Sequence, residues 1–227
     1  MLRRETSFSK FPGHKIRALW FSLSSRKQKS AIYLCAGQLV GYKRVDLAVE
    51  AFTRMGKRLV VIGEGPERAR LQAMAGPTIS FLGRAPFDVL RESLARCRAL
   101  VFPGEEDFGI VPVEAMASGR PVLAYGRGGA MDTVVPGVTG LLFERQTADD
   151  IVATVERFER EETRFDSFVL RRHATAFDAS VFKRRMGALV EEALAASARL
   201  PVDDIAIARS RLAPAAPARV PLVATAP

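Results

Sequence analysis

The clearest sign of the fold is the stretch EEDFGIVPVEAMASGRPV, which spans residues 105–122. A short apolar run at residues 99–102 precedes it, and a second run at residues 121–125 closes it. This order predicts a strand, a loop, a helix and a second strand. Glu106 then lies in the loop after the first strand, and Glu114 lies early in the helix. Open α/β sheets bind their ligands at this carboxyl edge of the strands.

The same stretch carries groups that suit a phosphorylated sugar. The start of the predicted helix offers backbone N–H groups to an anion, because the first turn has no acceptors of its own and the helix dipole favours negative charge. These N–H groups belong to Phe108, Gly109, Ile110 and Val111. The carboxylates of Glu106 and Glu114 accept hydrogen bonds from hydroxyl groups. Together they indicate a ligand with both phosphates and hydroxyls, such as a sugar nucleotide.

Working outward from this stretch, strand and helix patterns alternate along most of the chain. The predicted strands are residues 32–37, 58–63, 78–82, 99–102, 121–125 and 140–143. The predicted helices are residues 45–55, 66–75, 87–96, 111–118, 131–135, 148–159 and 177–198, with Thr147 as the cap of the sixth. This alternation predicts an α/β fold with a Rossmann-like, doubly wound parallel sheet.

The two ends of the chain differ from the middle. Residues 1–30 hold eight Lys and Arg residues but one Glu, and so carry most of the net charge of +9. We expect an atypical basic leader at 1–30, a nucleotide-sugar-binding domain with terminal helices at 31–199, and a disordered Ala/Pro-rich tail at 200–227. The leader lacks aromatic interleaving and RNA-binding motifs, so no specific nucleic-acid partner is expected.

Several kinds of site and location are disfavoured by composition. No window approaches the ~18 consecutive apolar residues of a membrane span, and the amino-terminal residues lack the apolar core of a signal peptide. We therefore expect a cytoplasmic protein with at most peripheral membrane contact. We expect Cys35 and Cys97 to be buried free thiols, and His14 and His173 to be surface residues. Their spacing predicts no metal site.

Four motifs in order carry a resemblance to a known family. They are GQLVGYKRVD at 37–46, VIGEGP at 61–66, FLGR at 81–84, and the pair Glu106 and Glu114 with seven residues between them. Together they resemble the carboxyl-terminal, donor-binding half of retaining glycosyltransferases of family 4, which have the GT-B fold. The resemblance extends from residue 31 to about residue 194. It implies no cofactor and a nucleotide sugar as donor, with GDP-mannose favoured.

The resemblance implies roles for the cationic residues of the expected site. Lys43 matches the family lysine that contacts the donor diphosphate, and Arg44 lies beside it. Gln38 stands where the family usually has Arg, so it can donate a hydrogen bond but adds no charge. Arg84 matches a position near the nucleobase. The alternative for each cation is a solvated charge in a loop.

Roles for the remaining residues follow in the same way. Glu106 matches the carboxylate that contacts the transferred sugar, and Glu114 matches the one that holds the ribose hydroxyls. Glu106 and Lys43 are therefore the expected catalytic residues. The backbone of Phe108, Gly109, Ile110 and Val111 would face the phosphate or the sugar. The alternative for both glutamates is an exposed acidic side chain.

By this resemblance the expected activity is transfer of a hexose, with mannose favoured, to a glycan or lipid-linked acceptor with retention. Such enzymes act in cell-surface polysaccharide biosynthesis, at the inner face of the membrane. The motifs all belong to donor binding. Two alternatives therefore stay open: a non-catalytic nucleotide-sugar-binding module, which includes a truncated remnant, and one subunit of a split enzyme that works with a separate acceptor-domain chain.

Overall fold

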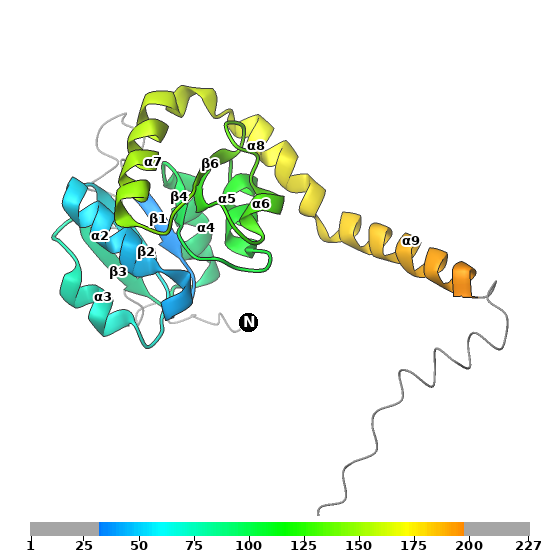
Figure 1. Cartoon of the computed structure of the whole chain (residues 1–227), viewed down its shortest axis with the longest axis horizontal. Helices are drawn as coiled ribbons and strands as arrows, with labels where there is room; N and C mark the ends of the chain where they lie inside the picture. The colour runs from blue at the N-terminus through cyan, green and yellow to red at the C-terminus, as the bar shows by residue number, and fades with distance from the viewer. Residues whose placement is uncertain (1–31, 198–227) are drawn as a thin grey trace, which may run out of the picture. The chain divides into compact units, whose positions relative to one another are not determined.

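The computed structural model describes residues 32–197, and its centre is a six-stranded parallel sheet (Figure 1). The strands are β1 (Ile32–Ala36), β2 (Arg58–Ile62), β3 (Ile79–Gly83), β4 (Leu100–Phe102), β5 (Val122–Tyr125) and β6 (Gly140–Phe143). They lie in the order β3-β2-β1-β4-β5-β6, and each pair of neighbours is parallel. The predicted Rossmann-like α/β fold is confirmed.

Helices follow the strands along the chain. They are α2 (Val45–Met55), α3 (Arg68–Met74), α4 (Phe87–Arg96), α5 (Ile110–Ala117), α6 (Ala130–Thr133), α7 (Ala148–Glu161), α8 (Ser167–Ala174) and α9 (Ala179–Ser197). Three short 3-10 turns are η1 (Gly41–Lys43), η2 (Glu162–Arg164) and η3 (Thr175–Phe177). Each predicted helix is present, with ends that differ by one or two residues at most.

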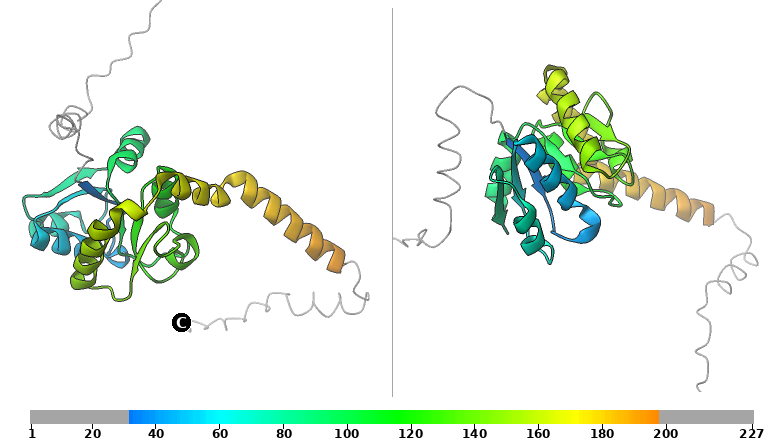
Figure 2. Two further views of the ribbon diagram at one scale, coloured as in Figure 1. Left: turned by 90° about the horizontal axis from the view of Figure 1, so that it is seen from above. Right: turned by 60° about the vertical axis from the view of Figure 1, so that its left-hand side comes forward.

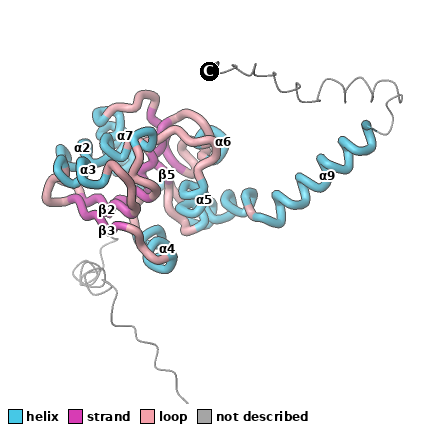
Figure 3. Tube along the Cα trace, turned by 90° about the horizontal axis from the view of Figure 1, so that it is seen from below, coloured by secondary structure: helices cyan, strands magenta, loops and turns pink. Residues whose placement is uncertain are grey.

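The sheet is covered on both faces, which is why its strands read as continuous apolar runs. Residues such as Tyr33 and Val61 point to one face, where they pack with side chains of α2 and α7. Their neighbours Leu34 and Val60 point to the other face, where they pack with side chains of α4, α5 and α8. Figure 3 and the turned views of Figure 2 show the strands between these two helical layers.

The position of the functional edge follows from the strand order. Strands β1 and β4 are neighbours, with Leu34 paired to Leu100. The chain leaves β1 toward the layer of α2 and leaves β4 toward the layer of α5. The loops at residues 37–44 and 103–109 therefore diverge at a topological switch point, where doubly wound sheets place their ligands.

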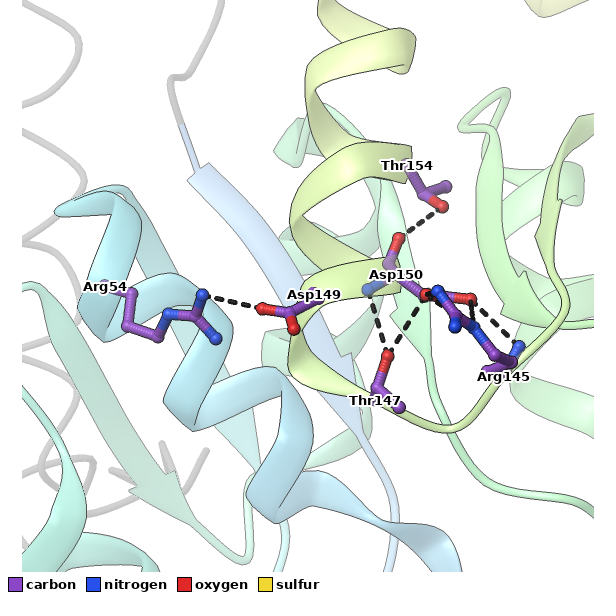
Figure 4. A network of polar contacts seen from close by, with 6 residues as sticks. All are labelled: Arg54, Arg145, Thr147, Asp149, Asp150 and Thr154. Carbon is purple, nitrogen blue, oxygen red and sulfur yellow. Dashed lines mark hydrogen bonds and ion pairs between the residues drawn. The ribbon is translucent and has the colours of Figure 1, made fainter.

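The amino-terminal end of α7 is fixed by its own side chains, as the sequence predicted for Thr147 (Figure 4). The Thr147 hydroxyl accepts a hydrogen bond from the Asp150 amide at 3.2 Å. Arg145 pairs with the Asp150 carboxylate at 2.8 Å, and Arg54 of α2 pairs with Asp149 at 2.7 Å. The cap removes an unpaired donor from the first turn, and the Arg54 contact ties α7 to α2.

The described residues up to Phe177 form one compact unit, and α9 belongs to a second. Along α9, large apolar side chains are exposed at Phe182, Met186, Leu189, Val190 and Leu194. The leader expected at 1–30 and the tail expected at 200–227 lie outside the described residues. Between residues 32 and 197, no helix has the length and apolar character that crossing a membrane requires.

Helix α8 is the one α-helix in the described residues that the sequence patterns did not predict. Its cap is Asp166, whose carboxylate accepts a hydrogen bond from the Phe168 amide at 2.7 Å. Only Leu170 and Ala174 are buried along it. Helix α8 is short and packs on α5, and this tertiary contact stabilises a helix that would be marginal by itself.

Candidate functional site

An ion pair spans the switch point. Lys43 ends the η1 turn after β1, and Glu106 lies in the loop after β4. The Lys43 Nζ atom is 3.0 Å from Glu106 Oε1, and the two side chains are 18% and 21% exposed. The two residues that the sequence predicted as catalytic are therefore in direct contact, although they come from loops on opposite sides of the switch point.

The contact depends on a close approach of the two loops. Gly104 in the second loop faces the backbone of Lys43, and a Cβ atom at position 104 would lie 2.8 Å from Lys43 Cα. A larger residue would push the loops apart, because the obstructing atoms belong to the backbone. Cys35, the last residue but one of β1, lies within the electrostatic influence of both side chains, and burial raises the pKa of its thiol to about 12. This thiol and that of Cys97 are buried and free, as predicted.

The start of α5 is open to an anion. Its cap, Gly109, has a φ of +77°, makes no side-chain cap contact and is followed by no acidic residue in the first turn. The amides of Ile110 and Val111 point out of the first turn, where no backbone acceptor exists within the helix. Pro112 is the third residue and has no N–H group. The positive end of the helix dipole is thus not neutralised by the helix itself.

Glu114 lies one turn further along α5 and is half-buried. Burial raises the pKa of its carboxyl group. Among residues 32–197, its carboxylate has neither a hydrogen bond nor an ion pair. A half-buried carboxylate without a partner costs free energy, and a ligand with hydroxyl groups would relieve that cost.

Arg44 and Gln38 are close to the pair in sequence, but neither is shown in contact with Lys43 or Glu106. Arg44 has a φ of +48°, the one positive value of a non-glycine residue between residues 32 and 197. Its guanidinium donates to the Asp46 carboxylate at 3.3 and 3.4 Å. This contact uses Nε and Nη2 of Arg44 and neutralises part of its charge toward a phosphate. Gln38 is exposed in the loop after β1.

Arg84 follows β3 at the same edge of the sheet, with an exposed side chain. Its backbone amide donates to Glu64 Oε1 at 3.3 Å, and Glu64 also pairs with Arg68. The loops after β2 and β3 are tied by the Gly63 amide, which donates to the Gly83 carbonyl at 2.9 Å. The structure thus fixes the backbone of Arg84 and leaves its guanidinium toward solvent.

Sequence patterns alone missed the residues that support the Glu106 loop. The loop at 126–129 lies against it, and the Gly129 amide donates to the Glu106 carbonyl at 2.7 Å. Phe108 is 44% exposed, and its ring meets the ring of Phe177, with centroids 5.9 Å apart. Neither partner stands near Glu106 in the sequence, so no local signal could have identified them.

The described residues give no indication of a metal centre. Within the 32–197 segment, no three His, Cys, Asp or Glu side chains are grouped so that they could hold a metal ion. The chemistry of this edge is instead that of a cation, two carboxylates and a helix start.

Comparison with known proteins identifies a family that matches this chain. The family described as glycosyl transferases group 1 matches residues 18–172. A GDP-mannose-dependent alpha-mannosyltransferase of Mycobacterium tuberculosis is 38% identical over 130 residues, which cover 55% of this chain and 34% of that protein. An uncharacterized glycosyltransferase of Methanocaldococcus jannaschii is 32% identical over 137 residues, which cover 58% of this chain and 39% of that protein. The matched segment spans well under half the length of either relative.

Solved structures agree with the fold. Sucrose-phosphate synthase of Thermosynechococcus elongatus is 28% identical with a TM-score of 0.65, over 73% of this chain and 46% of that one. HepE of Anabaena, solved with UDP and glucose, is 20% identical with a TM-score of 0.66, over 80% of this chain and 53% of that one. At this identity the second likeness concerns the fold alone. The described Rossmann-like fold is thus shared with about half the length of each of these glycosyltransferase structures.

Proposed function

The chain belongs to the glycosyl transferases group 1 family, and we propose that it binds the nucleotide-sugar donor of a retaining hexosyltransferase. The observation that carries this proposal is Glu114. It is a half-buried carboxylate with no partner among residues 32–197, and it lies on the helix that starts at the switch point. A ligand with hydroxyl groups and a phosphate would give the Glu114 carboxylate hydrogen-bond donors and would place an anion at the start of α5.

In this proposal each residue at the edge has a distinct partner on the donor. Lys43 and the amides of Gly109, Ile110 and Val111 bind the diphosphate, and Phe108 lines the approach to them. Glu114 accepts hydrogen bonds from the ribose hydroxyls. Glu106 accepts them from the hexose, and together with Lys43 it forms the catalytic pair.

The outer residues make weaker contributions. Arg84 lies beside the nucleobase, and Gln38 donates one hydrogen bond to a phosphate oxygen. Arg44 contributes less than Lys43, because its charge is shared with Asp46. A phosphate oxygen of the donor accepts the proton of the acceptor hydroxyl, so no side chain is assigned as general base and no cofactor is invoked.

GDP-mannose is the donor that we favour. The curated relative from Mycobacterium tuberculosis uses GDP-mannose according to its name and shares 38% identity over the matched segment. We propose mannose transfer to a glycan or lipid-linked acceptor in cell-surface polysaccharide assembly, at the inner face of the cytoplasmic membrane.

Transfer needs a second, acceptor-binding domain that closes on the donor. Closure orients the two substrates and excludes water, which supplies much of the rate enhancement. The matched segment spans 34% and 39% of two curated relatives, so the relatives carry further parts. We propose that a longer form of the protein or a separate chain supplies them. The described domain alone then binds donor without turnover.

Titration calorimetry tests the donor site. We expect the chain to bind GDP and GDP-mannose with a Kd between about 1 μM and 1 mM, which corresponds to ~4–8 kcal/mol. Glu114→Ala should weaken binding by ~1–3 kcal/mol, the usual loss for a hydrogen bond to a charged group. Glu156→Ala on the exposed face of α7 is the matched control. Absence of saturable binding of GDP, UDP, ADP and their sugars would refute the donor site.

A further inference from the structure

The loop that carries Glu106 is supported at two points. At its first point, the carbonyl oxygen of Glu106 accepts a hydrogen bond from the Gly129 amide at 2.7 Å. At its second point, the Phe108 ring meets the Phe177 ring at 5.9 Å and an interplanar angle of 62°, an edge-to-face contact. The two supports come from different elements, because Gly129 precedes α6 and Phe177 ends η3.

His173 contacts the elements that provide both supports. The His173 Nε2 atom is 2.8 Å from the carbonyl oxygen of Thr133, the last residue of α6. A carbonyl oxygen only accepts, so Nε2 carries the hydrogen in this contact. The His173 ring also meets the Phe177 ring, at 5.5 Å and 68°. One imidazole therefore contacts the end of α6 and the aromatic residue that supports Phe108. His173 is half-buried, although its sequence setting predicted a surface residue.

Helix α6 links His173 to the Glu106 loop. It is only four residues long, so its last residue, Thr133, bonds directly to Gly129 at its start. The amide and the hydroxyl of Thr133 both donate to the Gly129 carbonyl, at 3.1 and 2.9 Å. Gly129 in turn packs so closely that a Cβ atom there would lie 2.4 Å from Phe108 Cα. A shift of Thr133 would therefore move the residue that contacts both Glu106 and Phe108.

Core packing does not account for the aromatic part of this arrangement. Phe108 is 44% exposed and Phe177 is only half-buried, so their contact adds little apolar burial. The ring contact acts instead on the start of α5, because Phe108 directly precedes Gly109, the cap of that helix. A fixed Phe108 ring holds the amides of Gly109 and Ile110 in one orientation, and a fixed Glu106 carbonyl keeps the Glu106 carboxylate beside Lys43.

We infer that His173 and Phe177 are positioning residues for the donor site, which hold the loop at 106–109 in its binding conformation. This inference rests on the proposed function for the identity of the ligand. The arrangement of the loop itself does not depend on that function. His173 and Phe177 act through Phe108 and Gly129 and touch no donor atom.

Hydrogen exchange and GDP binding test this inference together in the full chain. In Phe177→Ala and His173→Ala, we expect amides of residues 105–111 to exchange ~3- to 10-fold faster, in line with loss of an aromatic contact. GDP affinity should fall by a similar factor. Phe177→Tyr keeps the ring and should restore both values. Phe168→Ala, which removes a 68% exposed ring from α8, is the matched control and should behave as wild type.

Each outcome decides the question. Faster exchange confined to residues 105–111, with weaker GDP binding and rescue by Tyr, supports the inference. Unchanged exchange in Phe177→Ala overturns it, as does faster exchange across the whole 32–177 segment, which marks a general structural role. Faster loop exchange with unchanged GDP affinity also overturns it. If wild type binds no nucleotide, the proposed function fails, and loop-specific exchange still supports the positioning of the loop.

Discussion

Two groups of charged residues at opposite ends of the parallel sheet differ in how completely they are paired. At the amino-terminal end, Glu159 of α7 accepts hydrogen bonds from three donors: Tyr33 at 3.0 Å, Lys57 at 2.8 Å and Arg98 at 2.8 Å. Arg98 also pairs with Glu162 at 2.6 Å. At the carboxyl-terminal end, Lys43 has one carboxylate partner and Glu114 has none among residues 32–197.

The carboxyl pKa values follow this difference. Burial tends to raise the pKa of Glu159, but hydrogen bonds from Lys57 and Tyr33 outweigh burial, so the pKa is lowered. Burial alone acts on Glu114, and its pKa is raised. Arg98 further covers the Tyr33 and Phe158 rings, at 5.3 and 5.7 Å from their centroids. Charges with complete partners stabilise the fold, and charges with incomplete partners are available to a ligand.

The largest effect on stability is expected from disrupting the fully paired cluster around Glu159. Glu159→Ala removes the acceptor of three donors and leaves the buried Tyr33 hydroxyl without this partner. We expect the free energy of unfolding to fall by ~2–4 kcal/mol, because Tyr33 and Lys57 lose this carboxylate and Arg98 keeps only Glu162. Urea denaturation measures this change, and GDP affinity should stay at its wild-type value.

Glu156→Ala provides the control for that experiment, since Glu156 lies on the same helix but is exposed. It should change the unfolding free energy by about 0.5 kcal/mol or less. Equal effects of the two substitutions would show that the amino-terminal cluster contributes no more than ordinary surface charges.

A middle-sized effect is expected from opening the ion pair at the functional end. Glu106→Gln keeps the size of the side chain but removes the charge that competes with a phosphate for Lys43. We expect GDP to bind ~3- to 10-fold more tightly, about 0.6–1.4 kcal/mol. The gain from adding mannose to GDP should shrink at the same time, because the hexose loses its carboxylate. Titration calorimetry with both ligands measures the two changes.

Glu105→Gln removes the same charge from the neighbouring, exposed position and is the matched control. It should leave the affinities for GDP and GDP-mannose close to wild type. Equal gains from the two substitutions would show that general charge, and not the Lys43 pair, sets GDP affinity.

Much of the fold could be predicted from sequence, since strands buried on both faces give unmistakable apolar runs such as that at residues 59–62. Helix α2 was predicted at its observed bounds because six of its eleven residues are buried on one face. Helix α8 has two buried residues and gave no such signal. A broad buried face such as that of α2 makes the bounds of a helix readable from local pattern.

The site divides in the same way. Motif resemblance placed Lys43, Glu106 and Glu114 at one edge of the sheet, and the structure brings the first two into contact. The roles of all three remain predictions. The contact of Phe177 with Phe108 joins residues far apart in the sequence. No periodic pattern encodes such a contact, because it depends on how the chain returns over the sheet after α8.

The smallest effect concerns the pH dependence of Glu114. Its folded-state pKa lies above the unfolded value of about 4.5, so the folded protein holds more protons between these two values. Stability should therefore fall as the pH rises through this window, and the penalty should be complete above the folded pKa.

Glu114→Gln removes the charge and should stabilise the protein at pH 7 by about 0.5 kcal/mol or less. Urea denaturation at about pH 4 and pH 7 measures the difference, which should disappear at the lower pH. GDP binding at pH 7 should weaken in the same variant. A Gln variant less stable than wild type at pH 7 would mean that Glu114 already has a stabilising partner, and the contrast between the two ends of the sheet would not hold.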